Sequence, residues 1–260
     1  MRFKLILEPA TIKRIIPINY QYELSAWIYK TIHYGNPEFS EWLHNHGYMD
    51  GKKQFRLFTF SKFHIEKYQI SGDRMEILSP MLSVYISFYT EEAVDPFITG
   101  LFANQQFSVG DKLSQVEFRV SSIEKIAEPV WLPQMKFRTV SPLVISIKGE
   151  RGADYLSPDA AGYNECFNKN LLSKYLAVMK QRQYESQTIT FINDKALTFQ
   201  LLSKPKSKLI KIKSGTPAET MIKGYLFDFA ITAPLELMRL GYYAGFGEKN
   251  SLGFGSGELL

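Results

Sequence analysis

A glycine-rich stretch near the end of the chain, GYYAGFGEKNSLGFGSGELL (residues 241–260), has the composition of an anion-binding loop. Glycine lets the backbone adopt positive φ angles and lets another backbone approach closely. A loop built in this way presents backbone N–H groups, and concave arrays of N–H groups bind anions such as phosphate. The stretch places Gly245, Gly247, Gly253 and Gly255 close together, with the basic Lys249 among them.

The common nucleotide-binding motifs do not fit this stretch. The G-x-G-x-x-G motif requires a strand before it and a helix after it. Here residues 234–243 have the apolar pattern of a helix, and the residues after Leu252 are too few and too glycine-rich for another one. The G-x-x-x-x-G-K-[ST] motif is absent. Two interpretations remain, a loop that holds the phosphate of a larger ligand and a structural turn before a final strand.

A second candidate for phosphate contact is the stretch KPKSKLIKIK (residues 204–213), which includes Lys206, Lys208, Lys211 and Lys213. If its end is a strand, Lys211 and Lys213 lie on one face, because side chains alternate along a strand. These lysines could bind phosphates. Equally, they could protect an exposed edge strand from pairing with another chain.

Composition limits the class of protein. A chain of 260 residues holds one large domain or two of about 130 residues, and its 45% hydrophobic content supports real cores. The sequence has no apolar run of about 18 residues and no signal-peptide pattern, so we expect neither a membrane span nor export. Cys166 is the only cysteine, which excludes an internal disulfide and favours a cytoplasmic protein. The net charge of +5 is weak evidence for a nucleic-acid partner.

The elements of the first half follow the order β-α-β-β-α-β. Alternation predicts strands over residues 2–8, 55–65, 81–88 and 115–120, and helical spacing predicts helices over 20–34 and 91–103. A short extra helix begins at Pro37 with Asn36 as its N-cap and ends at Gly47. This order is that of a ferredoxin-like domain, here residues 1–128.

A linker with Pro129 and Pro133 leads into a second half with a similar pattern. We expect a strand over 137–147, a helix that opens at 157–159, and a hairpin that turns at Asn193, Asp194 and Lys195 between strands 188–192 and 197–202. The lysine stretch, a strand over 222–231, a helix from Pro234, the glycine loop and a last strand follow. The fold class is therefore α+β, with two tandem ferredoxin-like (RRM-like) domains, residues 1–128 and 129–260. Each is expected to have an antiparallel sheet with helices on one face.

The whole chain resembles the CRISPR repeat-processing endoribonucleases, the Cas-Six family of the repeat-associated (RAMP) superfamily. The resemblance rests on the loop GFGEKNSLGFG (residues 245–255), which fits the pattern G-x-G-x(5)-G-F-G between a helix and a final strand. It also rests on MRFKLILEP, YQYELSAWIYKTI, NPEFSEWLH and RLFTFS, which occur in the family's order. The resemblance implies a metal-independent nuclease without a cofactor, which cuts CRISPR precursor RNA within each repeat.

In the implied reaction the RNA 2′-hydroxyl attacks the adjacent phosphorus, leaving a 2′,3′-cyclic phosphate and a 5′-hydroxyl. This chemistry needs a base, an acid and positive charge. By the family pattern the histidine is His44 and the tyrosine is Tyr29. Among the basic residues Lys52, Lys53 and Arg56 our preference is Lys53. The RNA would be held by the glycine loop and the lysine stretch, through Gly245, Gly247, Lys249, Asn250, Ser251, Gly253, Gly255, Lys206, Lys208, Lys211 and Lys213. The loop lies far from His44 in sequence, so the fold must bring substrate from one to the other.

Other interpretations stay open. Histidines are structural more often than catalytic; His46 is the better candidate for a packed or capping residue, and His33 suits the end of a helix. The same fold could bind repeat RNA without cutting it, as a scaffold subunit of a CRISPR effector complex. A small-ligand protein with an anion-binding loop is a third interpretation. A homodimer is compatible with the sequence. No Cys/His spacing indicates a metal site.

Overall fold

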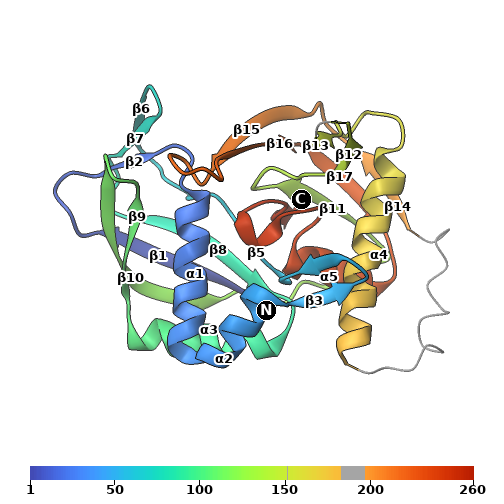
Figure 1. Ribbon diagram of the computed structural model, residues 1–260, viewed down its shortest axis with the longest axis horizontal. Coiled ribbons are helices and arrows are strands. Elements are labelled where there is room, and N and C mark those ends of the chain that lie inside the picture. Colours follow the sequence, from blue (N-terminus) through green and yellow to red (C-terminus); the bar gives the residue numbers. More distant parts are fainter. Residues whose placement is uncertain (151, 183–196) are drawn as a thin grey trace.

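The computed structural model describes residues 1–150, 152–182 and 197–260. They form two α+β units with the end of the chain between them (Figure 1). The predicted strand over 188–192 and the turn at residues 193–195 lie outside the described residues.

The first unit is a ferredoxin-like domain with an added edge strand. Its sheet has the antiparallel order β5-β8-β1-β10-β9. Without β9, this is the strand order of a β-α-β-β-α-β domain, in which the last strand, here β10, lies beside the first strand, β1. Helices α1 and α3 pack together against the sheet (Figure 1). The elements are β1 (Arg2–Pro9), β2 (Ile15–Pro17), α1 (Gln21–Gly35), α2 (Pro37–Asn45), β3 (Tyr48–Asp50), β4 (Lys53–Phe55), β5 (Phe58–Phe60), β6 (Tyr68–Ser71), β7 (Arg74–Ile77), β8 (Leu82–Phe88), α3 (Glu91–Ala103), β9 (Gln106–Gly110) and β10 (Gln115–Lys125).

The second unit repeats this topology. Its sheet has the order β14-β17-β11-β18, and β15 pairs with β16 in a separate long hairpin. The prediction of two ferredoxin-like domains is thus confirmed. The elements are β11 (Gln134–Thr139), β12 (Ser146–Gly149), β13 (Gly152–Tyr155), α4 (Tyr163–Gln181), β14 (Thr198–Leu201), β15 (Lys206–Ile212), β16 (Thr220–Leu226), β17 (Asp228–Thr232), α5 (Leu235–Ala244), the short 3₁₀ helix η3 (Asn250–Leu252) and β18 (Gly257–Leu259).

Three predicted strands are each divided in the structure. The strand over 55–65 is interrupted at Leu57, whose φ of 54° is left-handed. The strand over 137–147 ends at Thr139, and β12 then starts a hairpin with β13. The strand over 222–231 becomes β16 and β17, which belong to different sheets. In each case tertiary pairing overrides a continuous apolar pattern. The helix expected to open at 157–159 begins instead at Tyr163.

Local sequence explains the first helix pair. The Asn36 side chain accepts a hydrogen bond from the Phe39 N–H at 2.9 Å, which caps α2 as predicted. Leu24, Ile28 and Ile32 form the buried stripe of α1. The cap begins α2 directly after α1 ends, and the two helices pack against each other.

The two domains share one apolar core and several polar bridges. The buried Arg2 guanidinium lies over the rings of Tyr85 and Tyr242, at 5.2 and 4.9 Å, and donates to the Gly257 carbonyl. The β3–β4 hairpin reaches across to α4, where Lys180 pairs with Asp50 at 2.6 Å (Figure 1). In the part of the chain that the structure describes, no helix is both long enough and apolar enough to cross a membrane.

Candidate RNA-processing site

Helices α1 and α2 bring Tyr29 and His44 together. The centroids of their rings are 5.4 Å apart and their planes are nearly perpendicular. A hydrogen bond from the Ser40 hydroxyl to the Tyr29 carbonyl, at 3.2 Å, holds the two helices in register. Leu43 is fully buried, so the next side chain, His44, is directed to solvent. The Nδ1 atom of His44 lies 3.1 Å from Asn45 Oδ1, and the ring remains accessible to a ligand.

Arg56 is the cation that the structure places beside this pair. Its Nη2 donates to the His44 carbonyl at 2.5 Å, at the C-terminal end of α2, where the helix dipole favours positive charge. Arg56 lies between the end of β4 at Phe55 and Leu57, whose φ of 54° is left-handed, so the chain turns sharply where Arg56 meets α2. A non-glycine residue in this conformation costs on the order of 1–2 kcal/mol. Burial of the Leu57 side chain offsets that cost.

Tyr29 is mostly enclosed, with its hydroxyl close to Ser251 and Arg56. Burial raises the pKa of the Tyr29 hydroxyl, and the neighbouring Ser251 and Arg56 lower it in part. The hydroxyl is therefore neutral at pH 7. It can donate a hydrogen bond to an oxygen of a ligand, but it is a poor general base.

The glycine loop reaches this same place from the second domain. The Ser25 hydroxyl on α1 donates to the Ser251 carbonyl at 2.6 Å, and the Thr59 hydroxyl on β5 donates to the Phe254 carbonyl at 3.0 Å. The loop and His44 are far apart in sequence but lie at one site. The expectation that substrate must be carried from one to the other is therefore wrong.

The loop glycines are required by packing. Gly245, Gly247, Gly253 and Gly255 all have positive φ and are buried. A Cβ atom on Gly255 would lie 1.8 Å from the Phe246 carbonyl oxygen, and one on Gly253 would lie 2.7 Å from the Phe60 ring. These close approaches let the loop enter between the domains.

The backbone N–H groups of the loop are partly used inside the protein. Those of Gly253 and Gly255 donate to the carbonyls of Asn250 and Pro142, at 3.0 and 2.9 Å. The prediction that the loop presents its N–H groups to a ligand is therefore wrong for these two. Contact between the loop glycines and RNA stays a prediction. Lys249 is exposed, and Ser251 is half-buried beside Tyr29.

A buried lysine in α4, which sequence analysis missed, clamps the loop. Lys174 is 1% exposed, and its Nζ donates to the Gly245 carbonyl at 2.5 Å and to Asn250 Oδ1 at 2.6 Å. The Asn250 amide in turn donates to the carbonyls of Phe246 and Phe254. Burial lowers the pKa of Lys174 to about 7. The signal was available, since Lys174 falls three residues after Leu171 on the apolar stripe of α4.

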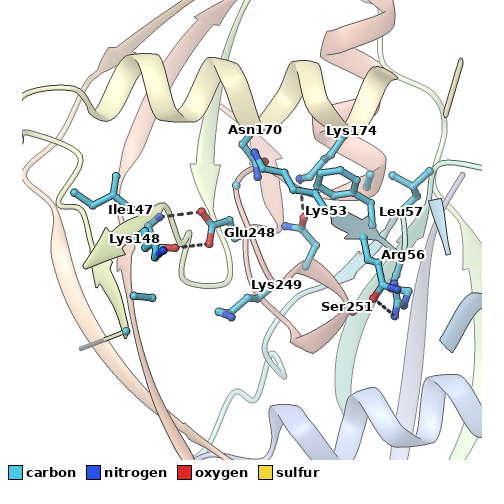
Figure 2. A pocket seen from close by; sticks show the side chains of 18 of the residues that line it. Lys53, Arg56, Leu57, Ile147, Lys148, Asn170, Lys174, Glu248, Lys249 and Ser251 are labelled. Carbon is cyan, nitrogen blue, oxygen red and sulfur yellow. Dashed lines mark hydrogen bonds between the residues drawn. The ribbon is translucent and has the colours of Figure 1, made fainter. Parts of the chain in front are cut away.

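A cavity of about 760 Å³ adjoins this site, between β4, the β12–β13 hairpin, α4 and the loop (Figure 2). Lys53 lines this cavity together with Arg56, Lys249 and Ser251. Lys53 is exposed on β4, as is Lys52 at the hairpin turn. Of the three cations that sequence analysis considered, the structure thus puts Arg56 at the His44–Tyr29 pair and Lys53 in the adjoining cavity.

The predicted lysine strand lies at a second cleft of about 820 Å³ between the domains. Lys208 lines it opposite Lys4 and Lys62 of the first domain. Lys206 is exposed. Lys211 pairs with Glu219 at 3.1 Å.

The predicted strand positions of the last two lysines hold only in part. Strand β15 ends at Ile212, so Lys213 lies one residue beyond it, in a left-handed turn with φ of 53°. Only Lys211 of this pair therefore occupies a strand position.

Of the histidines outside the site, His46 is the C-cap of α2, as suggested, but it is exposed rather than packed. His33 is exposed in the last turn of α1, also as suggested. In the ranges 1–150, 152–182 and 197–260, no three His, Cys, Asp or Glu side chains are grouped as metal ligands.

Two ferredoxin-like units, with a glycine-rich loop of the second packed against the first, define a RAMP-type protein. A solved structure described as an RAMP protein binding different RNA substrates superposes with a TM-score of 0.79 at 26% identity, covering 100% of this chain and 99% of that one.

Sequence comparison identifies the family. Residues 15–124 match the family model of the N-terminal part of the CRISPR-associated protein Cas6, and residues 126–259 match that of its C-terminal part. The chain is 30% identical over 248 residues to the CRISPR-associated endoribonuclease Cas6 1 of Methanocaldococcus jannaschii, covering 93% of this chain and 86% of that protein. It is 28% identical over 263 residues to an endoribonuclease-like Cas6 protein of Pyrococcus furiosus, covering 100% and 99%. The chain therefore belongs to the Cas6 family.

Proposed function

We propose that this chain is a metal-independent endoribonuclease that cleaves CRISPR precursor RNA within its repeats. The observation that carries the proposal is the meeting of His44, Tyr29 and Arg56 beside the glycine loop, in a member of the Cas6 family. The name of the M. jannaschii relative supports the activity, and the description of the RAMP structure supports binding of RNA.

Each residue has a role that fits its surroundings. The exposed His44 ring exchanges a proton with the RNA, taking it from the 2′-hydroxyl or giving one to the leaving 5′-oxygen. Tyr29, neutral because burial raises its pKa, donates a hydrogen bond to the reacting phosphate or the 2′-oxygen. Positive charge stabilises the phosphorane oxygens.

We assign that charge to Arg56 rather than to Lys53, the residue preferred from sequence. A guanidinium has five N–H donors; Arg56 Nη2 donates to the His44 carbonyl and to Gln54 Oε1, and the guanidinium also lies beside the Tyr29 hydroxyl. Nη1 and Nε can therefore bind a phosphate next to His44. Lys53 would contact RNA from the adjoining cavity.

The rest of the RNA would follow the basic surfaces between the domains. Lys206 and Lys208 on β15, with Lys4 and Lys62 across the cleft, would bind its phosphates. Lys249 and Ser251 would hold the RNA near the cut.

The test is cleavage of a CRISPR repeat RNA in the presence of EDTA. We expect a cyclic-phosphate product from the wild type and a rate about 10²–10⁴-fold lower from His44→Ala. Arg56→Ala should lower the rate about 10²-fold or more, and Lys53→Ala less. His33→Ala, which removes another exposed histidine, is the control. Undiminished cleavage by His44→Ala would refute the assignment of His44.

A second candidate function is a non-catalytic, repeat-RNA-binding scaffold subunit of a CRISPR effector complex. The description of a solved structure as an RAMP protein binding different RNA substrates, which names binding alone, favours this alternative. It predicts tight, salt-dependent binding of repeat RNA without a cyclic-phosphate product. Copurification with effector subunits, and the oligomeric state of the free chain, would test the partners that sequence analysis suggested.

A further inference from the structure

The cavity beside the candidate catalytic site has a polar floor that the proposed reaction does not use. Asn170 and Lys174 extend into it from α4, and Glu248 extends into it from the glycine loop (Figure 2). Asn170 is only 6% exposed, and among the described residues its side-chain Oδ1 has no hydrogen-bond partner. A buried amide without a partner is unfavourable in the free protein, and such groups are found where a ligand or water completes the site.

Glu248 is held in a fixed orientation at this floor. Its Oε1 accepts a hydrogen bond from the Ser146 N–H at 2.9 Å, and its Oε2 accepts one from the Ser146 hydroxyl at 2.7 Å. Each carboxylate oxygen can accept a further hydrogen bond. The floor therefore combines carboxylate and amide acceptors with amide and ammonium donors.

The walls and the rim of the cavity have a different character. Phe55, Leu57, Ile147 and Ala244 supply apolar surface. The rim carries the cations Lys53, Arg56, Lys148 and Lys249. Apolar walls suit a flat aromatic ring, the rim suits phosphates, and the floor suits a hydrogen-bonding edge.

We propose that this cavity binds an unpaired nucleobase of the RNA, next to the phosphodiester that is cleaved. The placement beside the cut rests on the proposed function, since Arg56 is shared between the cavity rim and the His44–Tyr29 pair. The base stacks against the apolar wall and presents its Watson–Crick edge to Asn170 and Glu248. The free acceptor positions of Asn170 Oδ1 and of the Glu248 carboxylate favour a base with several N–H groups on that edge. Guanine presents N1–H and an amino group there, more donors than adenine, cytosine or uracil, so guanine binds best.

The experiment is an abasic scan of the repeat RNA. Each unpaired nucleotide in turn loses its base, and the affinity of the full-length His44→Ala protein is measured by fluorescence anisotropy, so that the RNA stays intact. The same scan is run with Asn170→Leu and with Asn164→Leu added to His44→Ala. Asn164 is exposed on the same helix outside the cavity, so it provides the same chemical change without the site. Cleavage mapping with the wild type locates the cut.

We expect loss of one base, adjacent to the cut, to weaken binding about tenfold or more. In the protein that also carries Asn170→Leu, loss of the same base should weaken binding less than about threefold. The protein that also carries Asn164→Leu should lose as much affinity as the His44→Ala protein itself. A Glu248→Gln variant, which can keep its contact with the Ser146 hydroxyl, should change which base is preferred at that position. This second variant tests the site should Asn170→Leu not fold.

Three results would overturn the proposal. The first is that loss of no single base weakens RNA binding. The second is that loss of the sensitive base weakens binding equally in all variants. The third is that the sensitive base lies far from the cut. Base discrimination that depends on Asn170, in a wild-type protein that never cleaves, would refute the proposed nuclease activity and support the base-binding cavity. The experiment therefore distinguishes failure of the proposed nuclease activity from failure of the proposed base-binding cavity.

Discussion

The buried Lys174 should make the stability of this protein depend on pH in a direction opposite to that of a salt-bridged lysine. Its ordinary pKa is 10.5, and burial lowers it to about 7 in the folded chain. Between these values the unfolded chain binds more protons than the folded chain, so the free energy of unfolding rises with pH. The slope is at most about 1.4 kcal/mol per pH unit. Below pH 7 the lysine is charged in both states and contributes no slope.

The choice of pH range separates Lys174 from other groups. Burial lowers the pKa of the Met1 amine from 8.0 to about 6, so it contributes a slope of the same sign below pH 8. Burial raises the pKa of Tyr243 to about 12, and a tyrosine of this kind contributes the opposite sign near pH 10, where the unfolded chain ionises first. The range from pH 8 to 9 is therefore the most selective for Lys174.

The assay is urea unfolding at pH 8 and pH 9 of the wild type, Lys174→Met and Lys169→Met. Lys169 is exposed on the same helix and serves as the control. From pH 8 to 9, the wild type and Lys169→Met should gain about 1 kcal/mol more in unfolding free energy than Lys174→Met. Absolute stability is not diagnostic, because methionine removes a buried charge but leaves the Gly245 carbonyl without its donor. Parallel slopes in all three proteins would show that Lys174 titrates normally and would refute the reasoning.

Two further predictions concern the loop and the lysine strand. Gly255→Ala should lower the free energy of unfolding by more than about 2 kcal/mol in the same urea assay, because a Cβ atom at this position would lie 1.8 Å from the Phe246 carbonyl oxygen. Gly72 also has a positive φ but has open space around it, so Gly72→Ala should lower the free energy of unfolding by only about 1 kcal/mol. Lys208→Gln should reduce the slope of log K against log salt for repeat RNA by about 0.7 if it contacts one phosphate. Lys211→Gln should change that slope less, because Lys211 is paired with Glu219; equal effects would contradict this.

The repeated ferredoxin-like topology could be predicted because local pattern and tertiary structure agree for most of its elements. Strand β1 alternates Phe3, Leu5 and Leu7 toward the core, and α1 carries its buried stripe at helical spacing. The divided strands could not be predicted, because continuous apolar residues also suit a chain that changes sheets. Leu57 shows the limit most clearly, since leucine seldom adopts a left-handed conformation and only its buried environment holds it there.

The candidate site was predictable in its parts but not in its assembly. His44 and Tyr29 followed from family resemblance, and the structure brings them together. The choice among Lys52, Lys53 and Arg56 depended on the turn at Leu57, which spacing alone does not reveal. Lys174 was visible as a lysine on an apolar stripe, but the partners that satisfy its ammonium come from a loop about seventy residues later.

The position of the glycine loop explains why the site requires both domains. His44, Tyr29 and Arg56 come from the first domain, whereas Ser251, which lies against the Tyr29 hydroxyl, comes from the second. The loop reaches Tyr29 because its glycines adopt positive φ angles and allow close contact. Lys174 then holds the loop in place through its hydrogen bond to the Gly245 carbonyl. A substitution that displaces the loop should therefore change the surroundings of Tyr29 even where the substituted residue makes no contact with Tyr29. In the proposed nuclease, the loop would therefore contribute to cleavage by completing the site, in addition to any contact that it makes with RNA.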